Sequence, residues 1–243
     1  MIPEKTTIVK NFLASKEIQT ILEDLDKNYS LAPDKNHYLP YPFPSIDWSK
    51  AEMYKEKTAR FVNSFSKDLV SILQYRLNNL FKPSQFNPIQ SISPEFQFNP
   101  FTLRILRPSK VDIHHHVENQ SVEQYANFFQ ELGYYLQVYN QFSFVLMVQA
   151  PEQGGEIVLF DEVWKGHHLV EQQRKALDDM DTAGAIAHKI KEVICLNAGD
   201  LLIFPAGITW HKVAEVSGNI ERITLGGFIG KSLTEENSYL FWS

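Results

Sequence analysis

The chain has 243 residues, of which 44% are hydrophobic and 21% are charged, and its formal net charge is −6. These proportions predict a globular protein with a substantial core, while the acidic balance and the scattered lysines and arginines argue against nucleic acid as a partner. The single cysteine, Cys195, excludes an intrachain disulfide and a zinc site built from several cysteines, and it is typical of a reducing compartment.

The N-terminal residues MIPEKTTIVK carry charges where a signal peptide would have an apolar run. No apolar stretch approaches the roughly 18–20 residues that cross a bilayer. We therefore expect a soluble, cytoplasmic protein with no membrane partner. Nothing in the sequence predicts an oligomeric state.

Residues 1–94 are expected to form a helical support with loops. A short strand leads into a helix that Ser15 caps, and a Pro-rich loop at 31–48 is long enough to act as a lid. Residues 51–81 are expected to form one amphipathic helix, followed by a loop at 82–93. The prediction of these two helices rests on apolar residues at helical spacing, which are Ile18, Ile21, Leu22 and Leu25 in the first, and Phe61, Phe65, Leu69, Leu73 and Leu80 in the second.

Residues 95–230 change to the alternating pattern of strands. Runs such as QFSFVLMVQA and RITLGGFIG predict buried strands. Helical insertions are expected near 121–140, as a second candidate lid, and near 165–190, and residues 231–243 are expected to be a C-terminal tail. Helices followed by antiparallel strands predict one domain over 1–243. Its fold class is α+β or mainly β, with a double-stranded β-helix (a jelly-roll, cupin-like core) and the N-terminal helices packed on one sheet.

The stretch VDIHHHVEN supplies the first half of a predicted metal site. If it forms a strand, His114, His116 and Glu118 point to one side and His115 to the other. A third ligand is expected from GDLLIFPAGITWHKV, where a Gly-Asp turn and an apolar strand lead to His211. Two histidines and one carboxylate on one face of a barrel form the facial triad of non-haem Fe(II) oxygenases.

Arg222 and Thr224 belong to the next predicted strand, and Arg222 lies 11 residues after His211 (222 − 211). Antiparallel pairing would turn both side chains into the same cavity as His211. A guanidinium suits a carboxylate ligand because it donates two parallel charge-assisted hydrogen bonds. The alternative for Arg222 is an ion pair with a surface acid, Glu221 or Glu215.

Over most of its length the chain resembles the Fe(II)/2-oxoglutarate-dependent oxygenase superfamily, of the broad prolyl-4-hydroxylase-like kind. IVKNFLASKEIQTIL resembles the N-terminal strand and helix of that family, and HVE matches its His-x-Asp/Glu motif. QGGEIVLFD is similar to its Gly-Gly-Glu strand. AGDLLIFPAGITWHKVAEVSGNIERITLGGF matches the strands with the distal histidine and the Arg-x-Ser/Thr pair. The chain departs from the commoner pattern in having Glu where Asp is usual.

The resemblance implies that His116, Glu118 and His211 bind Fe(II) as the catalytic metal site. It also implies that Arg222, assisted by Thr224, holds the distal carboxylate of 2-oxoglutarate. Such a dioxygenase uses O2, with ascorbate as an auxiliary reductant, and releases succinate and CO2. The implied function is hydroxylation of an unactivated C–H bond of a small molecule, such as an amino acid or an intermediate of natural-product biosynthesis.

Three other functions stay open. Radical halogenation in the same fold usually has a small residue in place of the carboxylate, so Glu118 argues against it unless its side chain turns away from iron. A cupin-like dioxygenase without 2-oxoglutarate would use His114, His116 and His211, and the third alternative is a non-catalytic jelly-roll binding protein. Arg104 and Arg107 are expected at the surface, and binding of an acidic substrate group is the alternative for one of them.

Overall fold

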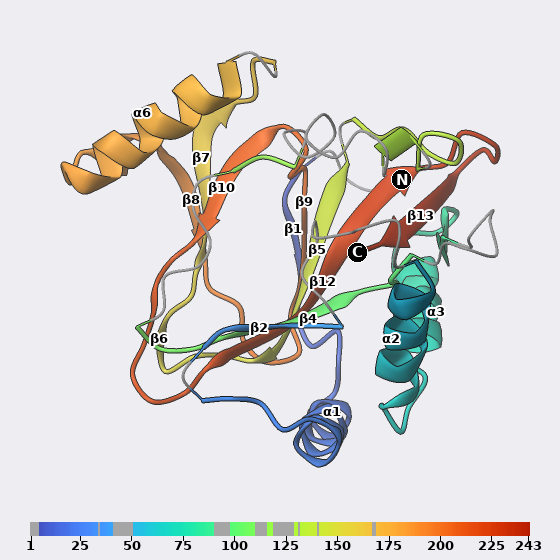
Figure 1. Ribbon diagram of the computed structural model, residues 1–243. Coiled ribbons are helices and arrows are strands. Elements are labelled where there is room, and N and C mark those ends of the chain that lie inside the picture. The colour runs from blue at the N-terminus through green and yellow to red at the C-terminus, as the bar shows by residue number, and fades with distance from the viewer. Residues whose placement is uncertain are drawn as a thin grey trace.

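The computed structural model describes residues 5–33, 35–40, 51–89, 98–109, 116–118, 129–130, 132–139, 141–166 and 169–243. Four α-helices and three β-sheets make up these parts of the chain (Figure 1). The helices are α1 (Ser15–Asn28), α2 (Ala51–Asn63), α3 (Leu69–Leu80) and α6 (Val170–Thr182), with a 3-10 turn η3 (Ile186–Lys189). The strands are β1 (Thr7–Val9), β2 (His37–Leu39), β3 (Gln85–Pro88), β4 (Thr102–Leu106), β5 (Phe142–Gln149), β6 (Gln153–Gly154), β7 (Ile157–Val163), β8 (Ile190–Ile194), β9 (Leu201–Phe204), β10 (Thr209–Val213), β11 (Val216–Ser217), β12 (Arg222–Lys231) and β13 (Ser238–Trp242).

The largest sheet has eight strands and is centred on β12. Its main path runs β1-β9-β5-β12-β13-β3, and β4 also pairs with β12 and carries β2 on its other edge. All pairings in this sheet are antiparallel except that of β13 with β3. Strand β12 therefore has partners along both edges, β5 on one and β4 and β13 on the other, which fixes its position within the sheet.

The N-terminal helices cover the outer face of this sheet (Figure 1). Ile21 of α1 and Leu77 of α3 belong to one buried cluster with Ile223, Leu225 and Ile229 of β12. Burying an aliphatic or aromatic side chain of this size stabilises the fold by about 1.5–3 kcal/mol each. The apolar stripes of the helices thus hold the alternate residues of β12 outward, which leaves the intervening residues to face inward.

A second sheet, of order β10-β7-β8, lies opposite the inner face of the large sheet. Met147 of β5 and Leu202 and Phe204 of β9 share a buried cluster with Ile157 and Leu159 of β7. The two sheets therefore enclose a layer of side chains between them, and a small sheet of β6 and β11 lies beside them.

The helix α6 packs on the outer side of the second sheet, away from α1–α3 (Figure 1). Its Leu177 shares a buried cluster with Val158 and Phe160 of β7 and Trp210 of β10. Helix α6 and the turn η3 lie within the stretch 165–190 for which a helical insertion was expected. The α+β class, with helices packed on one sheet, is confirmed.

Residues 51–81 do not form one helix. The chain leaves the helical path after Asn63, and Asp68 begins α3 because its side chain accepts a hydrogen bond from the Ser71 backbone amide at 3.0 Å. Leu80, predicted on the buried face, is 44% exposed. Apolar residues continue at helical spacing across the break between Asn63 and Asp68, so the sequence pattern did not show that Asp68 begins a new helix.

Three further expectations are corrected. The N-cap of α1 is Ala14, not Ser15, and the Glu17 carboxylate accepts from the Ala14 backbone amide at 2.8 Å. Strands β2 and β3 occur inside the stretches 31–48 and 82–93 that were predicted to be loops. The C-terminal residues are not a tail, because β13 pairs with both β12 and β3.

About half of each predicted lid lies outside the described residues. Residues 41–48 and 121–128 belong to that part, and so do His114 and His115. In the described stretches, no helix combines the length and apolar character needed to cross a bilayer.

Candidate metal centre and cosubstrate pocket

Two of the predicted ligands come from a short segment that pairs with β10. His116 and His211 form an isolated antiparallel bridge in which each backbone amide donates to the carbonyl of the other residue at 3.0 Å. The Glu118 amide donates to the Ala206 carbonyl at 3.0 Å. Val117, between the two ligands, is buried in the cluster beneath α6. This alternation turns His116 and Glu118 toward the same side.

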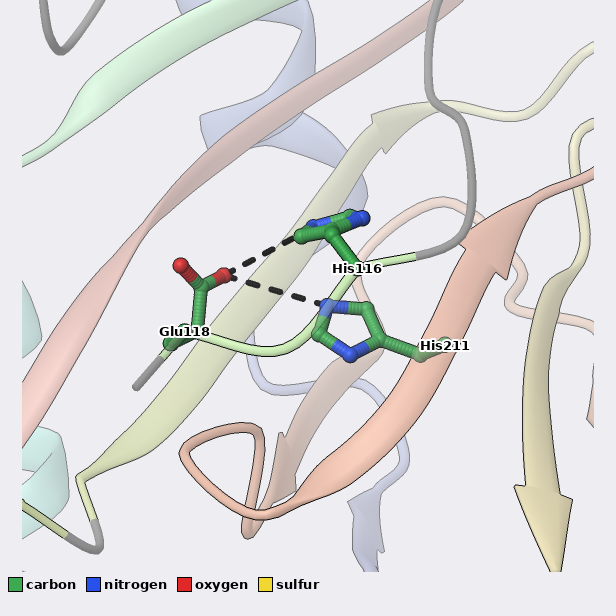
Figure 2. A group of neighbouring side chains, drawn as sticks. All are labelled: His116, Glu118 and His211. Atoms are coloured by element: carbon green, nitrogen blue, oxygen red, sulfur yellow. Dashed lines mark ion pairs between the residues drawn. The ribbon is translucent and has the colours of Figure 1, made fainter. Parts of the chain in front are cut away.

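The three side chains converge (Figure 2). Glu118 Oε1 lies 3.8 Å from His116 Nε2 and 3.8 Å from His211 Nε2. One ligand atom from each residue falls within 4.8 Å of the others. The imidazole rings of His116 and His211 have centroids 4.1 Å apart. Separations of this size allow one cation to sit about 2.0–2.2 Å from all three after small side-chain adjustments.

His211 is prepared to act as a neutral ligand. Burial, followed by the neighbouring His116 imidazole, holds the pKa of His211 well below its ordinary value of 6.5. Its Nδ1 lies 2.9 Å from the Thr209 carbonyl, which can only accept, so Nδ1 carries the proton. The Nε2 lone pair then points to the centre of the triad. The hydrogen bond from Nδ1 is the second interaction that usually fixes the tautomer and orientation of a metal-binding histidine.

The donor set fits Fe(II). Two imidazole nitrogens and one carboxylate oxygen on one side of a cation leave its other positions open, as in the facial triad of non-haem iron enzymes. Glu118 is 8% exposed, and Ser143 of β5 donates a long hydrogen bond of 3.5 Å to its Oε1. This contact orients the carboxylate toward the histidines.

Arg222 and Thr224 lie in the same hollow on the inner face of β12. They are 2% and 1% exposed, and Arg222 Nη1 donates to Thr224 Oγ1 at 3.4 Å. The Arg222 Nε has no hydrogen-bond partner among the described residues. Burial, with repulsion from Arg104 as the second cause, lowers the pKa of Arg222 to about 9. A bound carboxylate would remove this penalty by supplying the missing counter-charge.

The surface alternative for Arg222 is wrong. Glu221 pairs with Arg107 instead, at 3.2 Å, and Arg222 points inward. Gly155 makes room for it: a Cβ at this position would lie 2.9 Å from Arg222 Cδ, and the backbone has φ +71°. Glycine is therefore required here both by the backbone conformation and by the close approach of the arginine.

One pocket joins these groups. The triad, Arg222 and Thr224 line it, together with apolar residues of both sheets such as Val145, Ile157, Phe204 and Val213. Arg104 also lines the pocket, although the sequence favoured a surface position and gave a role in binding an acidic substrate group only as the alternative for Arg104 or Arg107. The alternation of β4 would place Arg104 on the inner face if its pairing with Thr224 were known. That pairing joins segments far apart in the chain, so the local sequence does not give it.

The fold is similar to solved structures. The crystal structure of an N-substituted L-amino acid dioxygenase from Burkholderia ambifaria AMMD matches with a TM-score of 0.62 and 14% identity, covering 98% of this chain and 86% of that chain. The same enzyme in complex with 2-oxoglutarate matches with a TM-score of 0.58, 14% identity and the same coverage.

A third structure, HygX from Streptomyces hygroscopicus with nickel and 2-oxoglutarate bound, has a TM-score of 0.52 at 10% identity, and the match covers 93% of this chain and 81% of that chain. No curated protein matches. At this low identity the likeness shows that the chain shares their fold, which agrees with the resemblance noted in the sequence, and His116, Glu118 and His211 are a group that could hold a metal ion.

A family model identifies the family to which the chain belongs. The model described as carrier-protein-independent halogenase WelO5 matches residues 5–243, nearly the whole chain. The chain therefore belongs to the carrier-protein-independent halogenase WelO5 family.

Proposed function

We propose that this protein oxidises an unactivated C–H bond of a small molecule at an iron held by His116, Glu118 and His211. The observation that carries the proposal is the meeting of three ligand atoms within 4.8 Å, from residues as far apart as 116 and 211. We further propose that the two facing sheets form the jelly-roll core of the superfamily, with the iron between them.

Fe(II) with 2-oxoglutarate and O2 supplies the oxidation, and the cosubstrate leaves as succinate and CO2. Arg222 binds the distal carboxylate of 2-oxoglutarate through its guanidinium, which has an unused Nε and no ion pair in the described part of the chain. The Thr224 hydroxyl holds Nη1 of that guanidinium in place. The apolar lining from Val145, Ile157 and Phe204 excludes water from the reacting groups.

Insertion of oxygen is the outcome that the triad supports best. The Glu118 carboxylate occupies the third ligand position, with its Oε1 equally far from both imidazoles and Ser143 holding it there. Hydroxylation needs no further ligand from the protein, so this triad is complete for it.

Halogenation is the second candidate, and the family placement favours it over hydroxylation. A halide would need a coordination position of its own at iron. Since Glu118 takes the position that this chemistry usually leaves vacant, halogenation requires Glu118 to swing away. The family description also supports a free small molecule as substrate, not one tethered to a carrier protein.

Product analysis separates the two outcomes. Protein loaded anaerobically with Fe(II) and 2-oxoglutarate is exposed to O2 with a panel of amino acids and natural-product intermediates, with and without chloride. Hydroxylation predicts a gain of one oxygen that does not depend on chloride. A chlorinated product of the wild-type protein would instead assign halogenation and show that Glu118 leaves the metal.

The variant Glu118→Gly sharpens this test because it empties the third position without adding bulk. If Glu118 is a ligand, the variant binds Fe(II) more weakly and loses hydroxylation, and azide or chloride perturbs its metal spectrum. A variant that hydroxylates as fast as the wild type would show that Glu118 is not a ligand.

A further inference from the structure

A second guanidinium lies in the pocket and has no assigned partner. Arg104 of β4 pairs with Thr224 in the β4–β12 register, so its side chain rises from the inner face of the sheet next to the cosubstrate residues. It lines the pocket that contains the triad. Its Nε has no hydrogen-bond partner among the described residues, and no ion pair of Arg104 occurs there.

Arg104 is not a duplicate of Arg222. Arg222 lies opposite Leu106, and Thr224 lies opposite Arg104, so the two arginines are diagonal neighbours on one face. Such neighbours are separated by about 7–8 Å in an antiparallel pair, which is enough for each long side chain to direct its guanidinium to a separate anion. Arg222 is only 2% exposed, whereas Arg104 is half-buried, and both line the pocket.

The charged groups in the pocket leave a net positive charge that one more anion would neutralise. Burial lowers the pKa of the Arg104 guanidinium, and the Glu118 carboxylate opposes this shift without forming an ion pair with it. The described lining carries two arginines and one acidic residue. With Fe(II) and the dianion 2-oxoglutarate in place, one positive charge remains uncompensated. A buried charge without a partner is costly, so a group that neutralises it gains affinity.

We propose that Arg104 is the anchor for a carboxylate of the substrate, so that the substrate class is small carboxylic acids. A guanidinium recognises a carboxylate through two parallel hydrogen bonds, which fixes orientation as well as position. Anchoring at Arg104 would direct the rest of the substrate across the pocket toward the iron. This inference rests on the proposed function of the same site.

The probes are matched pairs of small molecules. Amino acids and their N-acetyl derivatives, aliphatic and aromatic, are each paired with the primary amide, which has the same shape without the charge. Binding is measured anaerobically as the change that each compound causes in the absorption spectrum of the protein with Fe(II) and 2-oxoglutarate. Turnover is measured in parallel as succinate release in the presence of O2.

The proposal predicts that wild-type protein responds to members of the carboxylate series and at least about tenfold more weakly to their amides. Arg104→Gln should raise the dissociation constant for the carboxylates by about 10- to 100-fold and remove the preference over amides. Its affinity for 2-oxoglutarate without substrate should stay within about twofold of wild type. Arg107→Gln is the matched control, because Arg107 pairs with Glu221 and should leave both affinities unchanged.

Two results would overturn the proposal. If no carboxylate has a stronger effect on wild-type protein than its amide, Arg104 does not anchor this class. If Arg104→Gln loses affinity for 2-oxoglutarate in the absence of substrate, Arg104 belongs to the cosubstrate site. Failure of the wild-type protein to bind 2-oxoglutarate at all is a different result, because it contradicts the proposed function whatever Arg104 does.

Discussion

The two faces of β12 show how one strand serves both stability and chemistry. On the outer face, Ile223, Leu225 and Ile229 pack under the N-terminal helices in an entirely apolar cluster. On the inner face, Arg222 and Thr224 are as deeply buried, but they are polar, and Arg222 has no ionic partner among the residues that the structure describes. Equal burial therefore has opposite consequences: the outer residues stabilise the fold, and the inner arginine reduces stability until an anion binds.

The largest expected effect lies at the metal. His211→Ala removes one of the three proposed ligands. Losing a residue that only hydrogen-bonds to a metal ligand typically costs roughly 10- to 100-fold, so Fe(II) affinity and succinate formation should fall by more than that. Iron content after anaerobic reconstitution measures this. His188→Ala, at an exposed histidine of η3, is the matched control and should retain full iron content. Full iron content in His211→Ala would remove the basis of the proposed site.

Arg222→Met tests the inner face of β12. It removes the guanidinium proposed to hold 2-oxoglutarate, and losing one partner of a buried charge pair costs about 2–5 kcal/mol, so 2-oxoglutarate affinity should fall by at least about 30-fold. Calorimetric titration of the Fe(II) protein measures this affinity.

The same variant should unfold at an equal or higher urea concentration than wild type when no 2-oxoglutarate is present. The reason is that it replaces a buried, unpaired charge by an apolar side chain. A marked loss of stability in this ligand-free state would mean that Arg222 already has a stabilising partner, and would break the contrast between the two faces.

Leu225→Ala tests the outer face. Leu225 is 4% exposed in the helix-facing cluster, so its truncation should lower the free energy of unfolding by about 2–5 kcal/mol. Urea unfolding measures this change. The folded variant should bind 2-oxoglutarate with wild-type affinity, and a loss comparable to that of Arg222→Met would show that the two faces are not independent.

Thr224→Val should have the smallest effect. It keeps the volume of the side chain and removes the hydroxyl that accepts from Arg222 Nη1 at 3.4 Å. Because a single hydrogen bond contributes about 0.5–1.5 kcal/mol, 2-oxoglutarate affinity should decrease by about 2- to 10-fold. Titration alongside Arg222→Met gives the ratio, and an unchanged affinity would remove Thr224 from the cosubstrate site.

Much of the architecture follows from local patterns. The alternation in QFSFVLMVQA and RITLGGFIG predicts β5 and β12, and the apolar stripe of α1 is visible at helical spacing. The break between α2 and α3 was missed because apolar spacing continues through it. Strands β3 and β13 were missed because they stabilise each other by pairing between residues far apart in the chain.

For the site, the residue types in HVE and in the histidine strand already indicate iron ligands. The sequence also placed Arg222 and Thr224 correctly on one face, since alternate residues of a strand point the same way. It could not assign Arg104, whose position depends on pairing with Thr224, nor Ser143, whose contact with Glu118 crosses from β5.

The sequence by itself determined the kinds of ligand atom, the period of each element and the resemblance to one superfamily. Only the tertiary structure decided that Glu118 meets both imidazoles, that Arg107 takes the surface acid, and that Arg104 turns inward. The physical reason is that side-chain direction within a strand is a local property. The neighbours across a sheet depend instead on hydrogen-bond register between distant segments, which is chosen by the burial of the whole core.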